Sequence, residues 1–402
     1  MAFDVRACRN FDEFGRAIYP VDQFFGSGLT DERIERFSRL LDTERMHAAF
    51  DGGEIVGGAG AFSFDFSVPG GSVPCAGVSV VGVLPTHRRR GVLRAMMDVQ
   101  LLDVHERGEP IAALFASEET IYGRFGYGIA SWHGEVEIPR EWNAFARPLE
   151  RRGTVRFVTS EEACELFPPV YEALRKKRPG MFSRSPAWWE LRRLRMPEEE
   201  KATPKRFAAL ELDGSTQAYA VYRTAPKFED AVSKARLEVI EAFGVTPQAT
   251  AEMWRFLLDV DLTATTAAEL LPADHPLFFL LASPRRARYR VYDSLWIRLV
   301  DVAAALSGRA YATEGSIVFE VHDAVCPWNE GRWKLESGTA SRTDEAAELA
   351  LEVEALGSAY LGAVSFEELR AAGRVEELAD GAVRRADALL AWRPLPWCPE
   401  IF

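Results

Sequence analysis

The chain has 402 residues, 48% of them hydrophobic and 27% charged, a balance typical of globular proteins and unlike that of disordered or fibrous ones. This length exceeds what one ordinary hydrophobic core organises, and we expect about three domains. The formal net charge of −12 gives a surface that repels phosphate backbones, which argues against nucleic acid as a partner and favours a cationic small molecule or a lysine-bearing peptide.

Export, membrane and metal signals are weak in this sequence. The first residues lack a basic head followed by an apolar run, and no apolar run approaches the ~20 residues of a membrane span. We therefore expect a cytoplasmic protein without a membrane partner. The five cysteines form no C-x-x-C pair and the six histidines are dispersed, so neither a disulfide framework nor a metal site is predicted. His322 beside Asp323 is expected to be an ordinary strand-edge pair.

The first segment, residues 1–145, alternates strands and helices. Its hydrophobic patterns and turn signals predict strands at 3–7, 78–84 and 111–116, a β-hairpin over 46–68, and helices at 11–18, 31–41 and from Gly91 to about 108. A charged, proline-flanked stretch at 139–153 marks the first domain boundary.

The middle segment, residues 146–287, predicts a second α/β unit without a glycine-rich phosphate loop. Helices are expected around 161–177 and 249–258, and strands around 207–212, 217–224 and 237–242. An arginine-rich stretch at 282–290 marks the second boundary. The last segment, residues 288–402, predicts a helix or helix-bearing start over 293–306, strands near 316–322 and 331–336, and helices from 343 onwards.

The sharpest local motif is V-S-V-V-G-V-L-P-T-H-R-R-R-G-V-L-R, residues 78–94. A strand leads into a turn bearing Arg88, Arg89 and Arg90, and Gly91 opens a helix whose first amides are unpaired. Unpaired amides together with guanidinium groups bind pyrophosphate well, and a Cβ at Gly91 would keep phosphates off the backbone. A basic turn exposed to water is the simpler alternative for a lone R-x-x-G, but the flanking strand and helix favour the phosphate interpretation.

A second motif, A-S-E-E-T-I-Y-G-R-F-G-Y-G, follows the next strand at residues 116–128. Its three glycines predict a tight turn that presents a tyrosine hydroxyl to the crevice where open α/β sheets bind ligands. A phenol within hydrogen-bond reach of a departing thiolate can donate its proton. Either Tyr122 or Tyr127 is then structural, and the other is the candidate acid.

The last thirteen residues, L-A-W-R-P-L-P-W-C-P-E-I-F, form an apolar segment stiffened by three prolines. Trp392, Trp397, Ile401 and Phe402 suit it for docking rather than fraying. If the segment docks, it delivers the carboxylate of Phe402 to a fixed place, where it holds or deprotonates a cation. A tail that only covers its own domain is the alternative.

Taken together, P-T-H-R-R-R-G, A-S-E-x-x-I-Y-G-R-F-G-Y-G, L-W-I-R-L-V-D-V, A-Y-L-G-A and the terminal phenylalanine resemble, in order and spacing, the Eis family of bacterial GNAT N-acetyltransferases. The resemblance covers nearly the whole chain. It implies a mixed α/β (α+β) protein with tandem GNAT domains, at 1–145 and 146–287. A sterol-carrier-protein-like domain carrying the catalytic C-terminus follows at 288–402, and the assembly implied is a homohexamer.

The resemblance also implies where acetyl-CoA, the co-substrate, would bind; no metal is implied. Tyr122 would be the general acid, and the carboxylate of Phe402 the general base, directly or through water. The remaining implied contacts are the main chain of Val81, Gly82 and Val83 for the pantetheine arm, the run Arg88, Arg89, Arg90, Gly91, Val92, Leu93 and Arg94 for the pyrophosphate, and Ser117 and Glu118 beside the cofactor.

Some roles stay open at this point. Leu93 stands where the common GNAT pattern has Gly or Ala, a departure that the Eis family shares. The substrate-pocket pattern of the family matches poorly over residues 19–26, so the role of Asp22 is undecided. A carboxylate is a weak base unless it is desolvated or linked by water, so Phe402 can instead anchor the cation, with Glu400 as the alternative carboxylate.

Two functions compete. The first is transfer of an acetyl group to primary amines of polycationic acceptors, which the resemblance extends to aminoglycosides and lysine side chains, often at several positions. The alternative is a carrier of a lipid or other apolar ligand that uses the GNAT part as a scaffold. The phosphate motif favours the enzyme, whereas only fold analogy supports the carrier.

Overall fold

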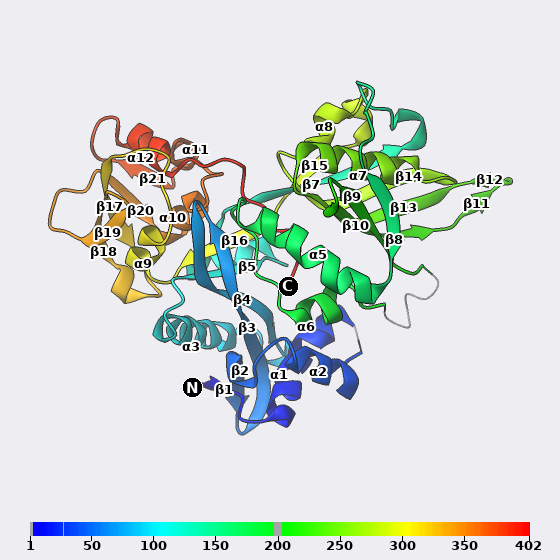
Figure 1. The fold of residues 1–402 in the computed structure, drawn as a ribbon. Helices are drawn as coiled ribbons and strands as arrows, with labels where there is room; N and C mark the ends of the chain where they lie inside the picture. The colour runs from blue at the N-terminus through cyan, green and yellow to red at the C-terminus, as the bar shows by residue number, and fades with distance from the viewer. Residues whose placement is uncertain (1–2, 27, 197–202) are drawn as a thin grey trace. The chain divides into compact units, whose positions relative to one another are not determined.

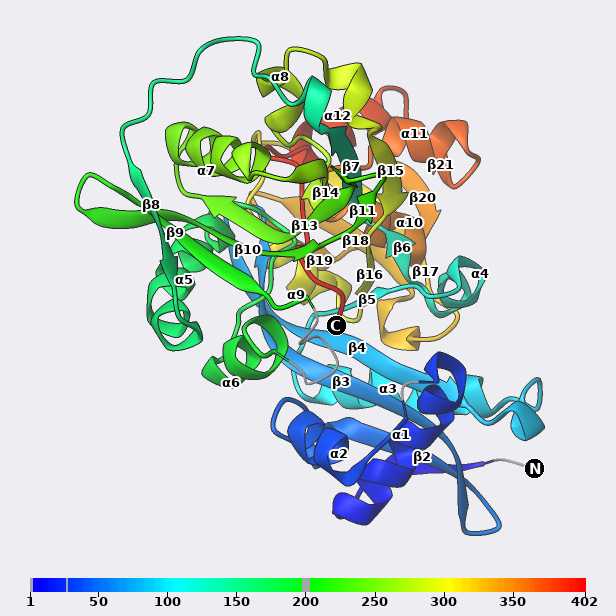
Figure 2. The same ribbon diagram turned by 90° about the vertical axis from the view of Figure 1, so that its right-hand side faces the viewer.

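A computed structural model describes residues 3–26, 28–196 and 203–402 of the chain. The chain folds into two compact units (Figures 1 and 2). Unit 1 comprises Met1–Ser131, Ser294–Pro396 and Ile401–Phe402, and unit 2 comprises Trp132–Asp293 and Trp397–Glu400. The units therefore divide the chain at 131/132, 293/294, 396/397 and 400/401, whereas the individual domain boundaries at 145/146 and 287/288 stay a prediction.

The first sheet of unit 1 confirms the strands and the hairpin expected near the N-terminus. Its order is β1-β2-β3-β4-β5-β16-β6. The strands are β1 (Asp4–Ala7), β2 (Met46–Asp51), β3 (Glu54–Val68), β4 (Gly71–Val83), β5 (Ile111–Phe115), β16 (Leu295–Leu299) and β6 (Gly128–Ile129).

Helices cover both faces of this sheet. They are α1 (Phe11–Phe25), α2 (Asp31–Ser38) and α3 (Val92–Glu106), at the three places expected. Gly57 and Gly58 show the arrangement, because successive residues of a strand face opposite sides. A Cβ on Gly57 would meet Val92 and Met96 of α3, whereas one on Gly58 would meet Ala17 of α1. The two helices therefore lie on opposite faces.

Of the two alternatives expected over residues 293–306, a continuous helix is wrong and a helix-bearing start is confirmed. Leu295–Leu299 form β16, which pairs antiparallel with both β5 and β6, and helix α9 (Val302–Ser307) begins only afterwards. All five residues of β16 are buried. A strand buried on both faces has no alternating pattern, so periodicity does not distinguish it from a short buried helix.

The second sheet of unit 1 has the order β19-β18-β17-β20-β21. Strands β17 (Ser316–His322) and β18 (Gly331–Glu336) confirm the prediction, and β19 (Thr339–Arg342) completes a meander. From residue 343 onwards the expected helices are α10 (Val353–Ala359), α11 (Phe366–Ala371) and α12 (Ala382–Leu390). Two short strands were not expected: β20 (Leu349–Glu352) precedes α10, and β21 (Val375–Glu377) lies between α11 and α12. Gly128 of β6 and Gly357 of α10 let α10 approach the first sheet closely. A Cβ on Gly128 would clash with the carbonyl oxygen of Glu354 in α10, and one on Gly357 with the carbonyl oxygen of Ile297 in β16.

Unit 2 is built on a sheet of order β15-β7-β14-β13-β10-β9-β8. Its strands are β15 (Arg290–Asp293), β7 (Trp132–Pro139), β14 (Thr263–Pro272), β13 (Ala235–Gly244), β10 (Ser215–Ala225), β9 (Arg206–Leu212) and β8 (Thr154–Val158), with a small pair β11 (Phe228–Glu229) and β12 (Val232–Ser233). The strands expected in this segment are confirmed.

Two helices confirm the expected α/β character of unit 2. On one face Phe167 of α5 (Ser160–Arg175) stacks on Tyr219 with ring centroids 4.2 Å apart. On the other face Trp254 of α7 (Pro247–Asp259) packs with Tyr222 and the alternate residues of β9 and β10. The shorter helices are α6 (Pro186–Trp188) and α8 (Leu277–Leu280).

Across the described parts of the chain, none of the helices combines the length and the apolar character needed to cross a membrane.

Candidate acetyl-transfer site

Two parallel strands of the first sheet of unit 1 part halfway along their length. β4 pairs with β5 only from Cys75–Gly77 to Ile111–Ala113. Beyond Gly77, β4 continues to Val83 beside β3, and β5 continues to Phe115 beside β16. We call this divergence the first fork. Its edge of β4 has backbone groups without a strand partner, which suits an extended, amide-bearing ligand.

The backbone of β4 is irregular where the fork opens. The register against β3 shifts between Gly58 and Gly60, and Val80 has a φ of +55°. Val81 and Val83 are half-buried, whereas Gly82 is buried against α1: a Cβ there would lie 2.8 Å from the amide nitrogen of Val21. Gly82 is therefore required by helix packing, in addition to any backbone contact with a ligand.

Helix α3 begins beside this fork without a side-chain cap. Its N-cap is Gly91, with φ +92° and no capping hydrogen bond, and a Cβ placed on Gly91 would meet no atom within 4 Å. The amides of Val92, Leu93 and Arg94 lie in the first turn, where a helix offers them no acceptor. Val92 is buried in the core and Leu93 is half-buried, so side chains anchor the turn while its amides stay available. A diphosphate fits this arrangement.

The four arginines of the motif differ in their surroundings. All are exposed. Arg90 donates Nη2 to Asp51 at 3.1 Å and lies over the ring of Phe3, and Arg94 has Nε 3.3 Å from the carboxylate of Asp98. A phosphate would compete with these carboxylates for Arg90 and Arg94, but each exposed pair is worth only about 0–1 kcal/mol.

The tyrosine turn follows β5. Ser117 and Glu118 are exposed directly after the strand, and helix α4 (Glu119–Tyr122) ends at Tyr122, which is 8% exposed. Tyr122 packs in one cluster with Val81, Leu93 and Leu114, the first and last of which belong to the two strands of the fork. Burial, with a smaller contribution from Glu118, raises the pKa of Tyr122 to about 12. The phenol is therefore protonated at neutral pH and able to donate.

Tyr127 lies deeper. Its ring meets that of Tyr122 edge-on, with centroids 6.0 Å apart, and it is fully buried. Its hydroxyl has no hydrogen-bond partner among the described residues, and burial raises its pKa. Both tyrosines belong to the same core cluster, and Tyr122 is the more exposed of the two, at 8%.

A buried ion pair, which sequence reasoning missed, supports this turn. Arg298 of β16 donates Nη2 to both carboxylate oxygens of Asp323, and a Cβ on Gly126 would lie 2.8 Å from the Arg298 guanidinium. The expected strand-edge pair of His322 and Asp323 is therefore wrong, because Asp323 is buried. His322 instead has its Nδ1 3.0 Å from Glu330 Oε1. A charged residue inside the apolar run L-W-I-R-L was the available signal.

Phe402 lies at the base of the first fork. Its ring meets those of Phe64 and Phe115 edge-on, at centroid distances of 5.6 and 5.7 Å. A Cβ on Gly77, the last residue of β4 paired with β5, would be 3.2 Å from the Phe402 ring. The docking expected of the tail is confirmed for this residue, whose ring packs where the two strands part.

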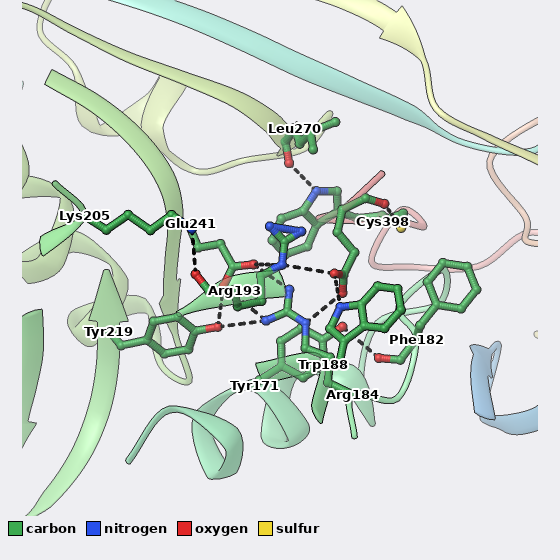
Figure 3. A network of polar contacts seen from close by, with 12 residues as sticks. Tyr171, Phe182, Arg184, Trp188, Arg193, Lys205, Tyr219, Glu241, Leu270 and Cys398 are labelled. Atoms are coloured by element: carbon green, nitrogen blue, oxygen red, sulfur yellow. Dashed lines mark hydrogen bonds and ion pairs between the residues drawn. The ribbon is translucent and has the colours of Figure 1, made fainter. Parts of the chain in front are cut away.

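Glu400, the alternative carboxylate, is occupied elsewhere. It is 1% exposed, and in unit 2 it accepts from Arg184 Nε at 2.7 Å, Trp188 Nε1 at 2.5 Å and Arg193 Nε at 3.0 Å. Burial alone would raise the pKa of Glu400, but Arg184 and Arg193 outweigh it and bring the pKa to about 2. Glu400 is therefore a poor proton acceptor. Figure 3 shows Arg184, Trp188 and Glu241 converging in this network.

Asp22 has a local partner. Its Oδ2 accepts the amide of Leu29 at 3.2 Å, which ties the end of α1 to the following segment. Asp22 is half-buried, so this bond does not exclude contact with a substrate. Its role stays a prediction.

Comparison with known proteins matches three regions of the chain. Residues 10–130 and 180–299 each match a family described as acetyltransferase (GNAT) domain, and residues 302–399 match the sterol carrier protein domain. These matches confirm the predicted fold class.

Full-length relatives also exist. An uncharacterized N-acetyltransferase of Streptomyces avermitilis is 41% identical over 410 residues, covering 100% of both chains. N-acetyltransferase Eis of Mycobacterium tuberculosis is 37% identical over 85% of this chain and 84% of its own length. The crystal structure of Eis1 from Mycobacterium abscessus superposes with a TM-score of 0.87 at 33% identity, covering 99% of this chain and 100% of that one.

Proposed function

Because the chain belongs to the Eis family of GNAT N-acetyltransferases, we propose that this enzyme uses acetyl-CoA to acetylate primary amines of polycationic acceptors. Aminoglycosides and lysine side chains are the proposed acceptor classes, with modification at several positions. The observation that carries the proposal is the first fork, where one sheet supports an uncapped helix N-terminus, a protonated tyrosine and the terminal residue of the chain.

The donor is proposed to bind along β4 and α3. The unpaired edge of β4 at Val81–Val83 would accept the pantetheine amides, and the first amides of α3 would hold the diphosphate. Arg88 and Arg89 precede Gly91 and would add charge-assisted bonds, while Ser117 and Glu118 flank the thioester end from the β5 side.

The reaction proposed is direct transfer. A neutral amine nitrogen forms a bond to the thioester carbonyl carbon, the C–S bond breaks, and the departing sulfur takes the proton of the Tyr122 hydroxyl. The nitrogen loses one proton, to the carboxylate of Phe402 or to water beside it. Tyr122 regains its proton from solvent, so atoms and charge balance over one turnover.

The acceptor is proposed to be recognised by charge. A free C-terminal carboxylate has a pKa near ~3.5, so it is anionic at neutral pH but a weak base unless it is desolvated or bridged by water. Phe402 would therefore hold the substrate ammonium and accept its proton directly or through water. The net charge of −12 supports a cationic acceptor.

Thiol release from acetyl-CoA tests the proposal. The purified chain is assayed with a multi-amine aminoglycoside, a linear polyamine, a lysine-containing peptide and a neutral monoamine, and mass spectrometry counts the acetyl groups on each product. Transfer to the aminoglycoside at more than one amine and to the lysine peptide is expected. Transfer to the neutral monoamine alone, or acylation of oxygen, would contradict the acceptor class.

We also propose, on the family resemblance, that the enzyme is a homohexamer and acts in the cytoplasm. Light scattering coupled to gel filtration should give six chain masses. A monomer at assay concentration would contradict the assembly without affecting the chemistry.

A further inference from the structure

Unit 2 contains a second fork with the same topology as the first. β13 and β14 are parallel neighbours, paired only between Ala235–Val239 and Thr263–Ala268. Beyond Val239, β13 continues beside β10, and β14 continues to Leu271 and Pro272 beside β7. The register against β10 shifts at this point, between Val221 and Tyr222, as it does against β3 in the first fork.

The second fork is filled by the chain's own tail. Trp397 donates its amide to the carbonyl of Pro179 at 2.8 Å and its indole Nε1 to the carbonyl of Leu270 at 2.5 Å. Leu270 belongs to β14 and has a φ of +52°, a conformation that costs energy for a leucine and that accompanies the bond from its carbonyl to the indole. On the β13 side, the ring of Phe243 lies 5.2 Å from that of Trp397.

The fit is close. Gly180 has a φ of +93°, and a Cβ there would lie 2.8 Å from the amide nitrogen of Trp397, so the tail passes where only glycine allows it. A cavity of about 20 Å³ remains beside the tail. It is lined by Val239–Phe243, Glu269–Pro272, Trp397 and Pro399. This volume holds about one water molecule. It does not admit a pantetheine arm.

A buried network fixes the next residues of the tail. Arg184 bridges Glu400, at 2.7 Å, and Glu241, at 2.5 Å, and its guanidinium lies 3.9 Å above the ring centroid of Tyr171. Arg193 contacts both carboxylates, at 3.0 and 3.3 Å. Two cations thus balance two anions, of which Arg184, Glu241 and Glu400 are buried, and loss of either partner leaves a buried charge uncompensated. Figure 3 shows Tyr171, Tyr219 and Glu241 around Arg184.

We propose that the second fork is a receptor for Trp397–Glu400, so that the GNAT domain of unit 2 binds the chain's own tail where the first domain binds its acyl donor. Two consequences follow. The enzyme binds one acetyl-CoA per chain, and Glu400 is a positioning residue that fixes the point from which Ile401 and Phe402 extend. The catalytic consequence rests on the proposed function, whereas the occupancy of the fork does not.

Cys398 reports directly on this occupancy. It is fully buried in the tail segment, and burial raises the pKa of its thiol, so alkylation should be slow while the tail is seated. Cys164 is exposed on α5, and Cys75 and Cys326 are buried in unit 1. Alkylation rates at the four positions, mapped by mass spectrometry in the full-length protein, therefore separate release of the tail from general unfolding.

The test compares Glu400→Gln with Glu165→Gln, a matched change at an exposed carboxylate of α5. Glu400→Gln should speed alkylation of Cys398 at least tenfold without changing Cys75 or Cys326. Glu165→Gln should leave the rates at Cys398, Cys75 and Cys326 unchanged; Cys164 is left out of this comparison, because Glu165 contributes to the raised pKa of its thiol. Turnover of Glu400→Gln should fall while the KM for acetyl-CoA stays constant. Unchanged alkylation of Cys398 would overturn the proposal.

Two further measurements keep the outcome decisive. If Glu400→Gln exposes all buried cysteines together, Trp397→Phe replaces it. That change keeps an aromatic ring beside Phe243 and removes the indole bond to Leu270. Faster alkylation of Cys398 alone is again expected. Calorimetric titration of the wild-type enzyme should give one acetyl-CoA per chain, and two would overturn the receptor. Faster alkylation of Cys398 with unchanged turnover would uphold the receptor and contradict the role of the Phe402 carboxylate.

Discussion

Arg298 Nη2 lies 2.7 and 2.6 Å from the two carboxylate oxygens of Asp323, and both side chains are buried. Arg298 belongs to β16, a strand of the first sheet, whereas Asp323 follows β17 of the second sheet. Asn329 also donates to Asp323, at 2.9 Å. The pair therefore joins the acetyltransferase sheet to the sterol-carrier-protein-like domain within unit 1, immediately beneath the tyrosine turn.

Removing one member of this pair should be costly. Arg298→Met leaves the Asp323 carboxylate buried without its cation, a change worth about 3–5 kcal/mol of stability. Calorimetry should show a lower Tm than for the wild type. The double variant Arg298→Met with Asp323→Asn should recover part of the loss, because no charge is then uncompensated. Equal Tm values for the wild type and the single variant would contradict this account.

The two tyrosines of the turn should respond differently to loss of the hydroxyl. Tyr122→Phe is expected to lower kcat by about 10²–10⁴, with the KM for acetyl-CoA little changed, if the phenol is the proton donor. Tyr127→Phe should be mild and neutral or slightly stabilising, because its buried hydroxyl has no partner to lose. Steady-state kinetics on both variants check this, and the reverse order of effects would assign the acid to Tyr127.

The diphosphate assignment is tested by Arg88→Ala and Arg89→Ala. Charge-assisted bonds to phosphate are worth about 1.5–3 kcal/mol each, so the KM for acetyl-CoA should rise by roughly 10- to 100-fold, and the KM for the amine much less. Arg16→Ala is a suitable control, because Arg16 is an exposed arginine paired with Glu54 on the same unit. Equal effects on both substrates would count against the site at α3.

Sequence alone predicted the parts of this site that are local. The turn from β4 to α3 and the turn at Tyr122 each lie within one short stretch, where glycine positions and strand-to-helix changes carry the signal. The strands and helices around them were confirmed for the same reason.

The missed features join distant parts of the chain. Glu400 and Arg184 are 216 residues apart, and no pattern near either residue specifies the other. β16 was missed because it inserts between β5 and β6, more than 160 residues earlier, and a five-residue strand buried on both faces has no period. Pairings of this kind depend on tertiary packing rather than on local propensity.

Acid should weaken the Glu400 network. The folded-state pKa of Glu400, about 2, lies below its ordinary value of 4.5, so its contribution to stability is fully present above about pH 4.5 and is lost as the pH falls towards 2. The Tm difference between the wild type and Glu400→Gln should therefore be largest above pH 5 and narrow below pH 4.5. A difference that widened as the pH fell would contradict the depressed pKa.

The terminal carboxylate of Phe402 should tolerate no added residue. Phe402 packs its ring between β4 and β5, and one added residue would move the charge by about 3.5 Å, well beyond the ~0.5 Å tolerance of a preorganised site. Appending Gly after Phe402, or amidating the terminus, should abolish most turnover. Acetyl-CoA binding by calorimetry and slow alkylation of Cys398 should persist, because Trp397 and Glu400 still hold the tail. A tail with only a structural role differs in one result, because a small polar addition is then tolerated. Trp397→Ala costs about 3–5 kcal/mol of stability in either case. Full activity of a C-terminally extended enzyme would therefore remove Phe402 from the chemistry and leave its ring as a packing residue of the first fork.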